Sequence, residues 1–186
     1  MDFNTHSKLE GRHALLSPST YHWINYKDDQ KLEARYRAAS AAKKGTDLHD
    51  LAMRAIRMRV KIARSEPTLC KYVADCVDYG MVVEQPLYYS DNCFGTADAI
   101  VFRRNVLRIF DLKTGIIQGS VHQLEVYAAI FCLEYHVDPY GIKYDFRIYQ
   151  HGTVYPYDVN PDQIAAIMDK IVDSDFKIEI MKEEGL

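Results

Sequence analysis

The sequence predicts an α/β fold with a central mixed β-sheet flanked by helices and with extra helices at the N-terminus. Apolar residues recur at helical spacing through much of the first 80 residues. Between residues 81 and 112 the pattern changes to short runs rich in Val, Ile, Tyr and Phe, which are typical of sequential strands. Helical and strand-like segments then alternate to the end, as they do in sheets covered by helices.

The helices of the first half are predicted from their end signals. Ser17-Pro18 combines a capping residue with proline at the first helical position, where its missing N–H costs nothing. Gly45 is expected to end a second helix, and Thr46 to cap a third. The predicted helices follow Ser17-Pro18 (with Trp23 and Ile24) and then span Lys31–Lys44, Asp47–Arg64 and Thr68–Asp78.

Strands dominate the second half of the prediction. Three consecutive strands are followed by one helix, and a His151-Gly152 turn then joins two further strands. Asn160-Pro161 begins the last helix with a cap and a proline. The predicted strands are Met81–Tyr89, Phe94–Arg103, Val106–Leu112, Ile142–Tyr149 and Thr153–Val159, and the helix between them is Gly119–His136.

Length and composition indicate one folded domain. The chain has 186 residues, 48% of them hydrophobic and 26% charged, which suffices for a single domain with its own core. We expect that domain to span residues 1–186, with residues 1–12 flexible. No apolar run approaches the roughly 20 residues of a bilayer span, and the N-terminus lacks the apolar stretch of a signal peptide. We therefore expect a cytoplasmic protein without a membrane partner.

The four cysteines carry no metal-binding or redox spacing. Cys70, Cys76, Cys93 and Cys132 form no CxxC pair, which argues against a zinc knuckle or a thioredoxin-like motif. Disulfides are rare in intracellular proteins. We therefore expect free or buried thiols.

Positive charge is concentrated in one part of the chain. The net charge is -3, yet residues 27–64 hold 11 Lys and Arg against 5 Asp and Glu, which leaves -9 on the remainder. Such a segment could hold a polyanion on one face. The alternative is that these residues are only the solvent-exposed faces of helices. Candidates for contact with DNA phosphates, by position alone, are Lys43, Lys44, Arg54 and Arg57.

The second and third strands place two carboxylates together. If Arg104-Asn105 is a two-residue turn, paired residue numbers sum to 209 and Asp98 lies opposite Asp111. Like charges about 5 Å apart across a ladder are destabilising, so the arrangement suggests a divalent cation between them. Asp oxygens suit Mg²⁺ or Mn²⁺. A register shifted by one residue, or a hairpin with both acids in solvent, would remove the site.

A lysine completes the predicted site. Lys113, two residues after Asp111, lies on the same face if the strand continues. Its ammonium can stabilise the charge that builds on a phosphoryl transition state, or orient the attacking water. A bound metal lowers the pKa of a water and polarises the phosphoryl oxygen. Together these groups favour phosphodiester hydrolysis.

These motifs resemble those of the PD-(D/E)XK nuclease superfamily. The segments at 95–100 (GTADAI) and 109–115 (IFDLKTG) are similar to its core, and the closest branch is the RecB-like one of phage recombination and CRISPR-associated exonucleases. Residues 45–49 (GTDLH) resemble its upstream helix motif, and residues 123–127 (QLEVY) its QxxxY motif. Residues 13–19 are similar to the opening of some phage-borne members. The resemblance implies a restriction-endonuclease-like core.

The resemblance also implies roles for individual residues. His49 becomes a metal ligand, although by itself it reads as a buried histidine hydrogen-bonded to backbone. Gln123 and Tyr127 lie four residues apart on one helix face, where they would brace Lys113 or contact DNA; the alternative is a polar face with one packed tyrosine. Glu84 is a weaker carboxylate candidate. The implied metal ligands are His49, Asp98, Asp111 and the backbone carbonyl of Leu112, and the implied catalytic residues are Asp98, Asp111, Lys113, Gln123 and Tyr127.

The function implied is that of a Mg²⁺- or Mn²⁺-dependent exonuclease. It would act on linear or single-stranded DNA ends in phage or bacterial recombination, with a homo-oligomer or a recombination protein as possible partners. CRISPR-associated members often hold an iron–sulfur cluster on one upstream and three C-terminal cysteines. No cysteine follows Cys132 here, so we expect no cluster. The alternatives are a structure-specific endonuclease and a catalytically idle DNA- or protein-binding module.

Overall fold

The computed structural model describes residues 25, 29–64, 67–115 and 120–184. The chain divides into two compact units, Met1–Thr46 and Asp47–Leu186, and each is described by itself. The helix predicted after Ser17-Pro18, the motif at 13–19 and the flexibility expected for 1–12 lie outside the described residues. The expectation of a single domain stays a prediction.

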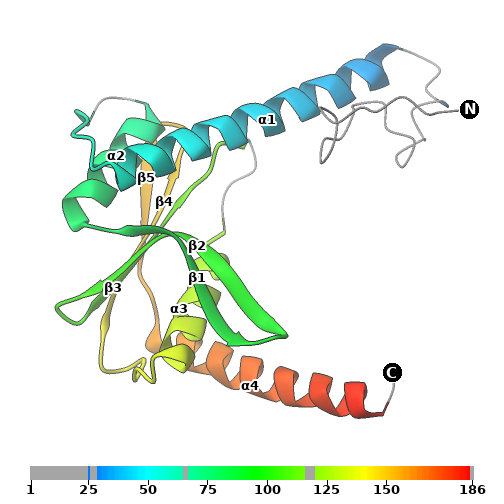
Figure 1. Ribbon diagram of the computed structural model, residues 1–186, viewed down its shortest axis with the longest axis vertical. Helices are drawn as coiled ribbons and strands as arrows, with labels where there is room; N and C mark the ends of the chain where they lie inside the picture. Colours follow the sequence, from blue (N-terminus) through cyan, green and yellow to red (C-terminus); the bar gives the residue numbers. More distant parts are fainter. Residues whose placement is uncertain (1–24, 26–28, 65–66, 116–119, 185–186) are drawn as a thin grey trace, which may run out of the picture. The chain divides into compact units, whose positions relative to one another are not determined.

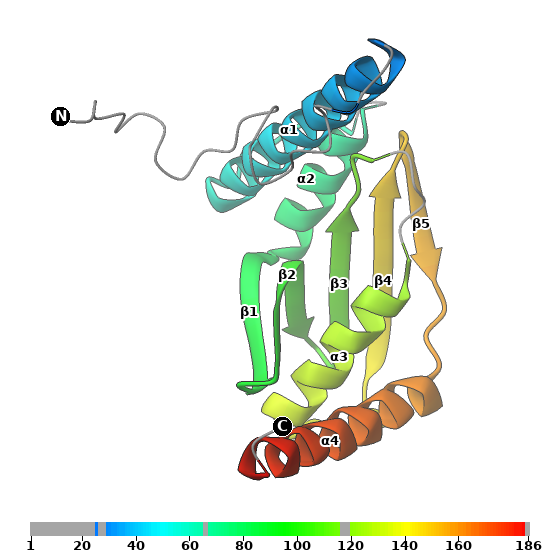
Figure 2. The ribbon, with the colours of Figure 1, turned by 90° about the vertical axis from the view of Figure 1, so that its right-hand side faces the viewer.

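The second unit contains a five-stranded mixed sheet. Strand order follows the sequence, β1-β2-β3-β4-β5, and only the β3–β4 pair is parallel (Figure 2). The expected α/β class, with a mixed sheet flanked by helices, is therefore confirmed. The strands are β1 (Val82–Ser90), β2 (Cys93–Arg103), β3 (Val106–Leu112), β4 (Lys143–Gln150) and β5 (Thr153–Tyr157).

Helices cover both faces of this sheet, as Figures 1 and 2 show. On one face α3 (His122–Glu134) and α4 (Pro161–Glu183) enclose a core that includes Ile100, Ile109 and Leu124. On the other face α2 (Thr68–Tyr79) and the C-terminal part of α1 (Asp29–Arg57) enclose a second core with Tyr72 and Phe110. Successive side chains of β3 thus enter opposite cores, because side chains alternate along a strand.

The β2–β3 register agrees with the prediction from the turn. Arg104 and Asn105 have φ of 52° and 62°, the left-handed values that a two-residue hairpin turn needs. Pairing runs from Arg103↔Val106 to Ala99↔Phe110, so paired numbers sum to 209. The last pair of the β2–β3 ladder is Ala99↔Phe110. Asp98 and Asp111 are the next two positions, just beyond that pair.

The break predicted between two N-terminal helices is wrong. α1 is one helix from Asp29 to Arg57, and Gly45 and Thr46 lie inside it. A glycine costs a helix interior only about 1 kcal/mol relative to alanine. The alanines, lysines and arginines on either side are strong helix formers and outweigh it.

α1 also ends earlier than predicted, at Arg57 instead of Arg64. Arg59 adopts φ 52° and its amide donates to Ile56 O at 2.9 Å. The amide of Val60 donates to Ala55 O at 3.0 Å. These two bonds form a Schellman motif, built here on arginine where glycine is usual, so no glycine marked this helix end in the sequence.

The remaining elements match the prediction within a few residues. α2 ends at Tyr79 with Gly80 in the left-handed region at φ 66°. α3 begins at His122, later than the predicted Gly119. The Asn160 side chain caps α4 by accepting a hydrogen bond from the Asp162 amide at 3.0 Å.

Two further expectations concern the described residues only. The cysteines are free thiols, with Cys76 and Cys132 buried. None of the described helices combines the length and the apolar character needed to cross a bilayer.

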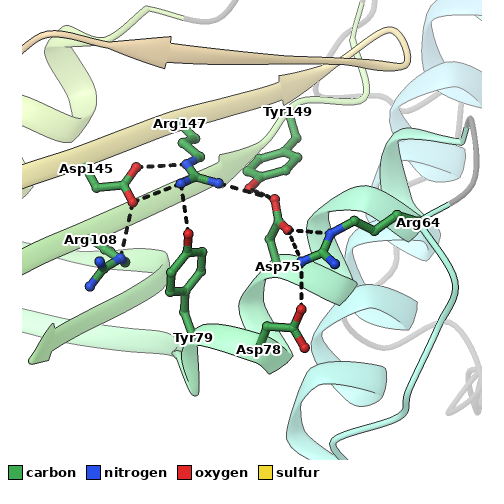
Figure 3. A network of polar contacts seen from close by, with 8 residues as sticks. All are labelled: Arg64, Asp75, Asp78, Tyr79, Arg108, Asp145, Arg147 and Tyr149. Carbon is green, nitrogen blue, oxygen red and sulfur yellow. Dashed lines mark hydrogen bonds and ion pairs between the residues drawn. The ribbon is translucent and has the colours of Figure 1, made fainter.

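A network of charged and polar side chains joins α2 to the sheet (Figure 3). Asp75 on α2 accepts hydrogen bonds from Arg64 Nε and Nη2 at 3.0 and 2.8 Å, and from the Tyr149 hydroxyl at 2.7 Å. Arg147 on β4 reaches Asp75 at 3.4 Å and also binds Asp145 and the Tyr79 hydroxyl. Because Tyr149 and Arg147 both come from β4, Asp75 links helix and strand directly.

We predict that Asp75→Asn destabilises the protein far more than Asp78→Asn. Both acids bind Arg64, but the Asp75 side chain is only 12% exposed and that of Asp78 is 59% exposed. Losing charge-assisted hydrogen bonds at a buried position costs about 1.5–3 kcal/mol, whereas an exposed ion pair contributes about 0–1 kcal/mol. Urea unfolding of both variants measures the difference. Equal losses would mean that the network does not secure α2.

Candidate active site

The candidate site lies where β2, β3, α1 and α3 of the second unit meet. Asp98 is on β2, near the end of its pairing with β3, and Asp111 is on β3. The strand pairing continues past Leu112, since the Lys113 amide donates to Tyr149 O at 2.9 Å. Lys113 therefore shares the face of Asp111, as the alternation predicts.

Lys113 makes two direct contacts with predicted site residues. Its Nζ donates to Asp111 Oδ1 at 3.0 Å and to Gln123 Oε1 at 3.1 Å. The Gln123 amide nitrogen in turn donates to the Tyr127 hydroxyl at 3.3 Å. One continuous chain of hydrogen bonds thus connects β3 to α3, and the predicted bracing of Lys113 by Gln123 is present.

Tyr127 is held against β2. Its hydroxyl donates to Thr96 O at 2.7 Å. A Cβ on Gly95 would meet Tyr127 Cε1 at 3.0 Å, closer than carbon atoms normally approach. The glycine of the 95–100 motif therefore makes room for the tyrosine of the QxxxY motif.

His49 contacts Asp98 from α1. Its Nε2 lies 3.2 Å from Asp98 Oδ2. The hydrogen bond to Asp98 raises the pKa of His49 above its usual 6.5, partial burial opposes the rise, and the charges of Asp98, Glu84 and Asp50 add to it. The histidine thus lies beside a carboxylate, in place of the backbone partner considered as its alternative.

Asp111 is the most unusual group of the site. Its side chain is 4% exposed, and its Oδ2 is buried without a hydrogen-bond partner in the described part of the chain. Burial raises the pKa of Asp111 above its usual range; the charge of Asp98 adds to the rise and Lys113 opposes it. An unpaired buried carboxylate oxygen is costly, so this atom needs a partner.

A divalent cation fits this chemistry. The unpaired oxygen of Asp111, the carboxylate of Asp98 and the imidazole of His49 are donors that Mg²⁺ or Mn²⁺ accepts. Within residues 29–64, 67–115 and 120–184, however, no three His, Cys, Asp or Glu side chains already converge on one point. Lys113 and His49 instead occupy one oxygen of each acid.

Glu84, a weak candidate in the sequence, belongs beside this site. It lies between the pairs Val83↔Ala99 and Gln85↔Ala97, across from Asp98, with a positive φ of 51°. Its charge contributes to the raised pKa of His49. The β1–β2 pairing, whose numbers sum to 182 at these positions, was the signal that could have identified it.

The four basic residues predicted to contact nucleic acid have different surroundings. Arg57 is paired with Glu84, through Nη2 and Oε2, and Arg54 is exposed. Lys43 is exposed within the first unit, and the side chain of Lys44 lies outside the described residues. Their contacts with DNA stay predictions, as does metal ligation by the Leu112 carbonyl. The Leu112 amide donates to Asp98 Oδ2 at 3.4 Å.

Tyr72 is a neighbour that the sequence did not suggest. It is fully buried on α2, where its hydroxyl lies beside the Cys76 thiol. Burial raises its pKa well above 10, and the charges of Cys76, Asp98 and Asp111 raise it further. Tyr72 therefore places a buried hydroxyl near the two acids.

Comparison with known proteins assigns no activity to this site. Residues 68–143 match a family described as a protein of unknown function (DUF2800). The matched range is less than half of the chain; it includes Asp98, Asp111, Lys113 and the QxxxY motif, and it excludes His49. No curated protein and no solved structure matches the chain.

We predict that His49 titrates above 6.5 in metal-free protein and that Asp98→Asn lowers its pKa. The asparagine keeps the size of the side chain but removes the charge that favours the imidazolium form. Proton NMR titration in EDTA follows the His49 ring directly. Asp169→Asn, on the distant helix α4, is the control and should leave the titration unchanged. An unchanged His49 pKa in Asp98→Asn would contradict the contact between the two side chains.

Proposed function

We propose that this chain is a metal-dependent nuclease of the RecB-like PD-(D/E)XK type that hydrolyses phosphodiester bonds in DNA. The observation that carries the proposal is the placement of Lys113, whose ammonium contacts both Asp111 and Gln123 beside the Asp98–His49 pair. Six predicted site residues, from two strands and two helices, thereby come together in one unit: His49, Asp98, Asp111, Lys113, Gln123 and Tyr127.

In this proposal Lys113 acts on a phosphate. Its side chain is 31% exposed, so the ammonium is open to a ligand while Asp111 and Gln123 orient it. A preorganised cation of this kind stabilises negative charge that develops on a phosphoryl oxygen. The same ammonium can hold an attacking water by hydrogen bonding.

The acids and His49 would hold the cation. Asp111 offers a buried oxygen with no partner among the described residues, and Asp98 and His49 adjoin it. When bound, Mg²⁺ or Mn²⁺ would supply Lewis acidity and lower the pKa of a water. Until then Lys113 and His49 partly neutralise the two carboxylates, which reduces their mutual repulsion.

Within this class we favour an exonuclease that acts on linear or single-stranded DNA ends during phage or bacterial recombination. That choice rests on the resemblance of the motifs, which is an argument by analogy. A structure-specific endonuclease would use the same residues. An idle binding module is disfavoured because idle copies usually lose the lysine or one acid, and this chain keeps Asp98, Asp111 and Lys113.

We predict release of nucleotides from end-labelled linear DNA with Mg²⁺ or Mn²⁺ and none in EDTA. Lys113→Ala should lower the rate at least about 10²–10³-fold, the usual effect of removing one transition-state donor. Asp98→Asn and Asp111→Asn should abolish hydrolysis. Lys143→Ala, an exposed lysine at the start of β4, is the matched control and should keep full activity.

Each other outcome of this assay has a defined meaning. Cutting of closed circular DNA would show an endonuclease instead of an exonuclease. Absence of metal-dependent hydrolysis of any DNA or RNA would favour the binding module. Full activity of Lys113→Ala would show that the site is elsewhere.

We also predict that Mn²⁺ raises the melting temperature of the wild-type protein. A ligand at 100 times its Kd stabilises the folded state by about 2.7 kcal/mol, which corresponds to roughly 5–10 °C for a chain of this size. Asp98→Asn and Asp111→Asn should each lose most of this shift, because each removes one anionic ligand. Asp169→Asn, an exposed acid on α4, should retain it. Equal shifts in all variants would exclude these acids as ligands.

A further inference from the structure

A pocket of about 330 Å³ opens beside the candidate active site. Its walls come from α1, from the start of α2, from the end of β3 and from the β4–β5 turn, all within the second unit. Leu112 and Lys113 line it, so the residue that would contact the phosphate is also part of the pocket wall. The pocket and the candidate site therefore adjoin each other at Lys113.

The walls of the pocket are mainly apolar. Leu48, Pro67 and Leu69 line it, and each is partly accessible to solvent. The volume is near the lower end of the roughly 300–1,000 Å³ typical of ligand sites. An apolar pocket of this size suits one flat ring system and would be too small for two stacked nucleotides.

The polar groups of the pocket match the edge of a nucleobase. Thr68 and Thr114 supply hydroxyls, which both donate and accept hydrogen bonds. His151 supplies the one aromatic ring among the residues that line the pocket. Proteins that hold an unstacked base combine such hydrogen bonds at its edge with apolar or aromatic side chains on its faces.

Hydrogen bonds hold the pocket open before a ligand arrives. The Gly152 amide donates to Thr68 Oγ1, and Lys71 Nζ donates to Gly152 O at 2.6 Å, which ties the β4–β5 turn to α2. The buried Gln150 side chain donates to Gly115 O at 2.7 Å and holds the segment that follows Lys113. A preformed pocket loses less affinity to ordering on binding.

We propose that this pocket binds a single unstacked nucleobase adjoining the scissile phosphate, which rests on the proposed nuclease function. Only one sugar separates a base from its phosphate, and Lys113 links the two sites. A base within a duplex is stacked and paired and must leave the helix to enter. The protein should therefore prefer single-stranded or frayed DNA ends to blunt duplex ends.

Binding of DNA to the inactive full-length Asp111→Asn protein in EDTA tests the proposal. Short single strands carry 2-aminopurine, or an abasic residue, at each position in turn. Emission of 2-aminopurine should change at one position from the end, and an abasic residue there should weaken binding about 5- to 150-fold, the range expected for one stacked base. Abasic residues at the other positions should have little effect.

Two substitutions connect that signal to the pocket. Leu69→Trp fills it and should abolish the preference for a base at that position. His151→Asn removes the ring, and asparagine tolerates the φ of 50° found there, so this variant keeps its fold and should lower the preference at least several-fold. Val172→Trp adds the same bulk to an exposed position of α4 and should change nothing.

The wild-type hydrolysis assay, run in parallel, separates the two proposals. If wild-type protein degrades DNA but abasic residues bind equally well at every position, the base pocket is wrong and the nuclease proposal stands. The same holds if His151→Asn and Leu69→Trp keep the full preference. If the protein neither degrades nor binds DNA, both proposals are overturned.

Discussion

The candidate site depends on one electrostatic constraint, which is the burial of the Asp111 carboxylate next to Asp98. One oxygen of Asp111 is held by Lys113, and the other has no hydrogen-bond partner among the described residues. A carboxylate in this position costs free energy that well-packed apolar residues would not. The cost is tolerated because Lys113 and His49 each bring a cationic or protonatable group to one acid. Gln123 and Tyr127 then serve to orient Lys113 beside these two acids.

Local signals in the sequence were sufficient for the hairpin that carries the acids. The Arg104-Asn105 turn determines the register of β2 and β3, and side-chain alternation then gives the shared face of Asp98, Asp111 and Lys113. The contact between Lys113 and Gln123 was predicted only from the resemblance of the motifs. The spacing of residues within one strand and one helix does not say how the two elements pack against each other.

Other features depend on tertiary context and were missed for that reason. Glycine is typical of a helix end, yet α1 continues through Gly45 and ends at Arg57. The left-handed residue that follows is Arg59, which carries no such signal in the sequence. Glu84 was only a weaker carboxylate candidate, because the position of β1 beside β2 is a tertiary feature. Asp75 joins residues more than 70 positions apart in the chain, and no local pattern indicates such a network.

The bonds that run from Lys113 to Thr96 have a fixed direction. Thr96 offers a backbone carbonyl, which can only accept, so the hydroxyl of Tyr127 must give its single proton there. That hydroxyl can then only receive from Gln123, whose amide is thereby locked with its oxygen toward Lys113. Through three successive hydrogen bonds, the backbone of β2 thus determines that Lys113 faces the oxygen of the Gln123 amide and not its NH₂ group. The orientation of the group that faces Lys113 is therefore set by the backbone of a neighbouring strand.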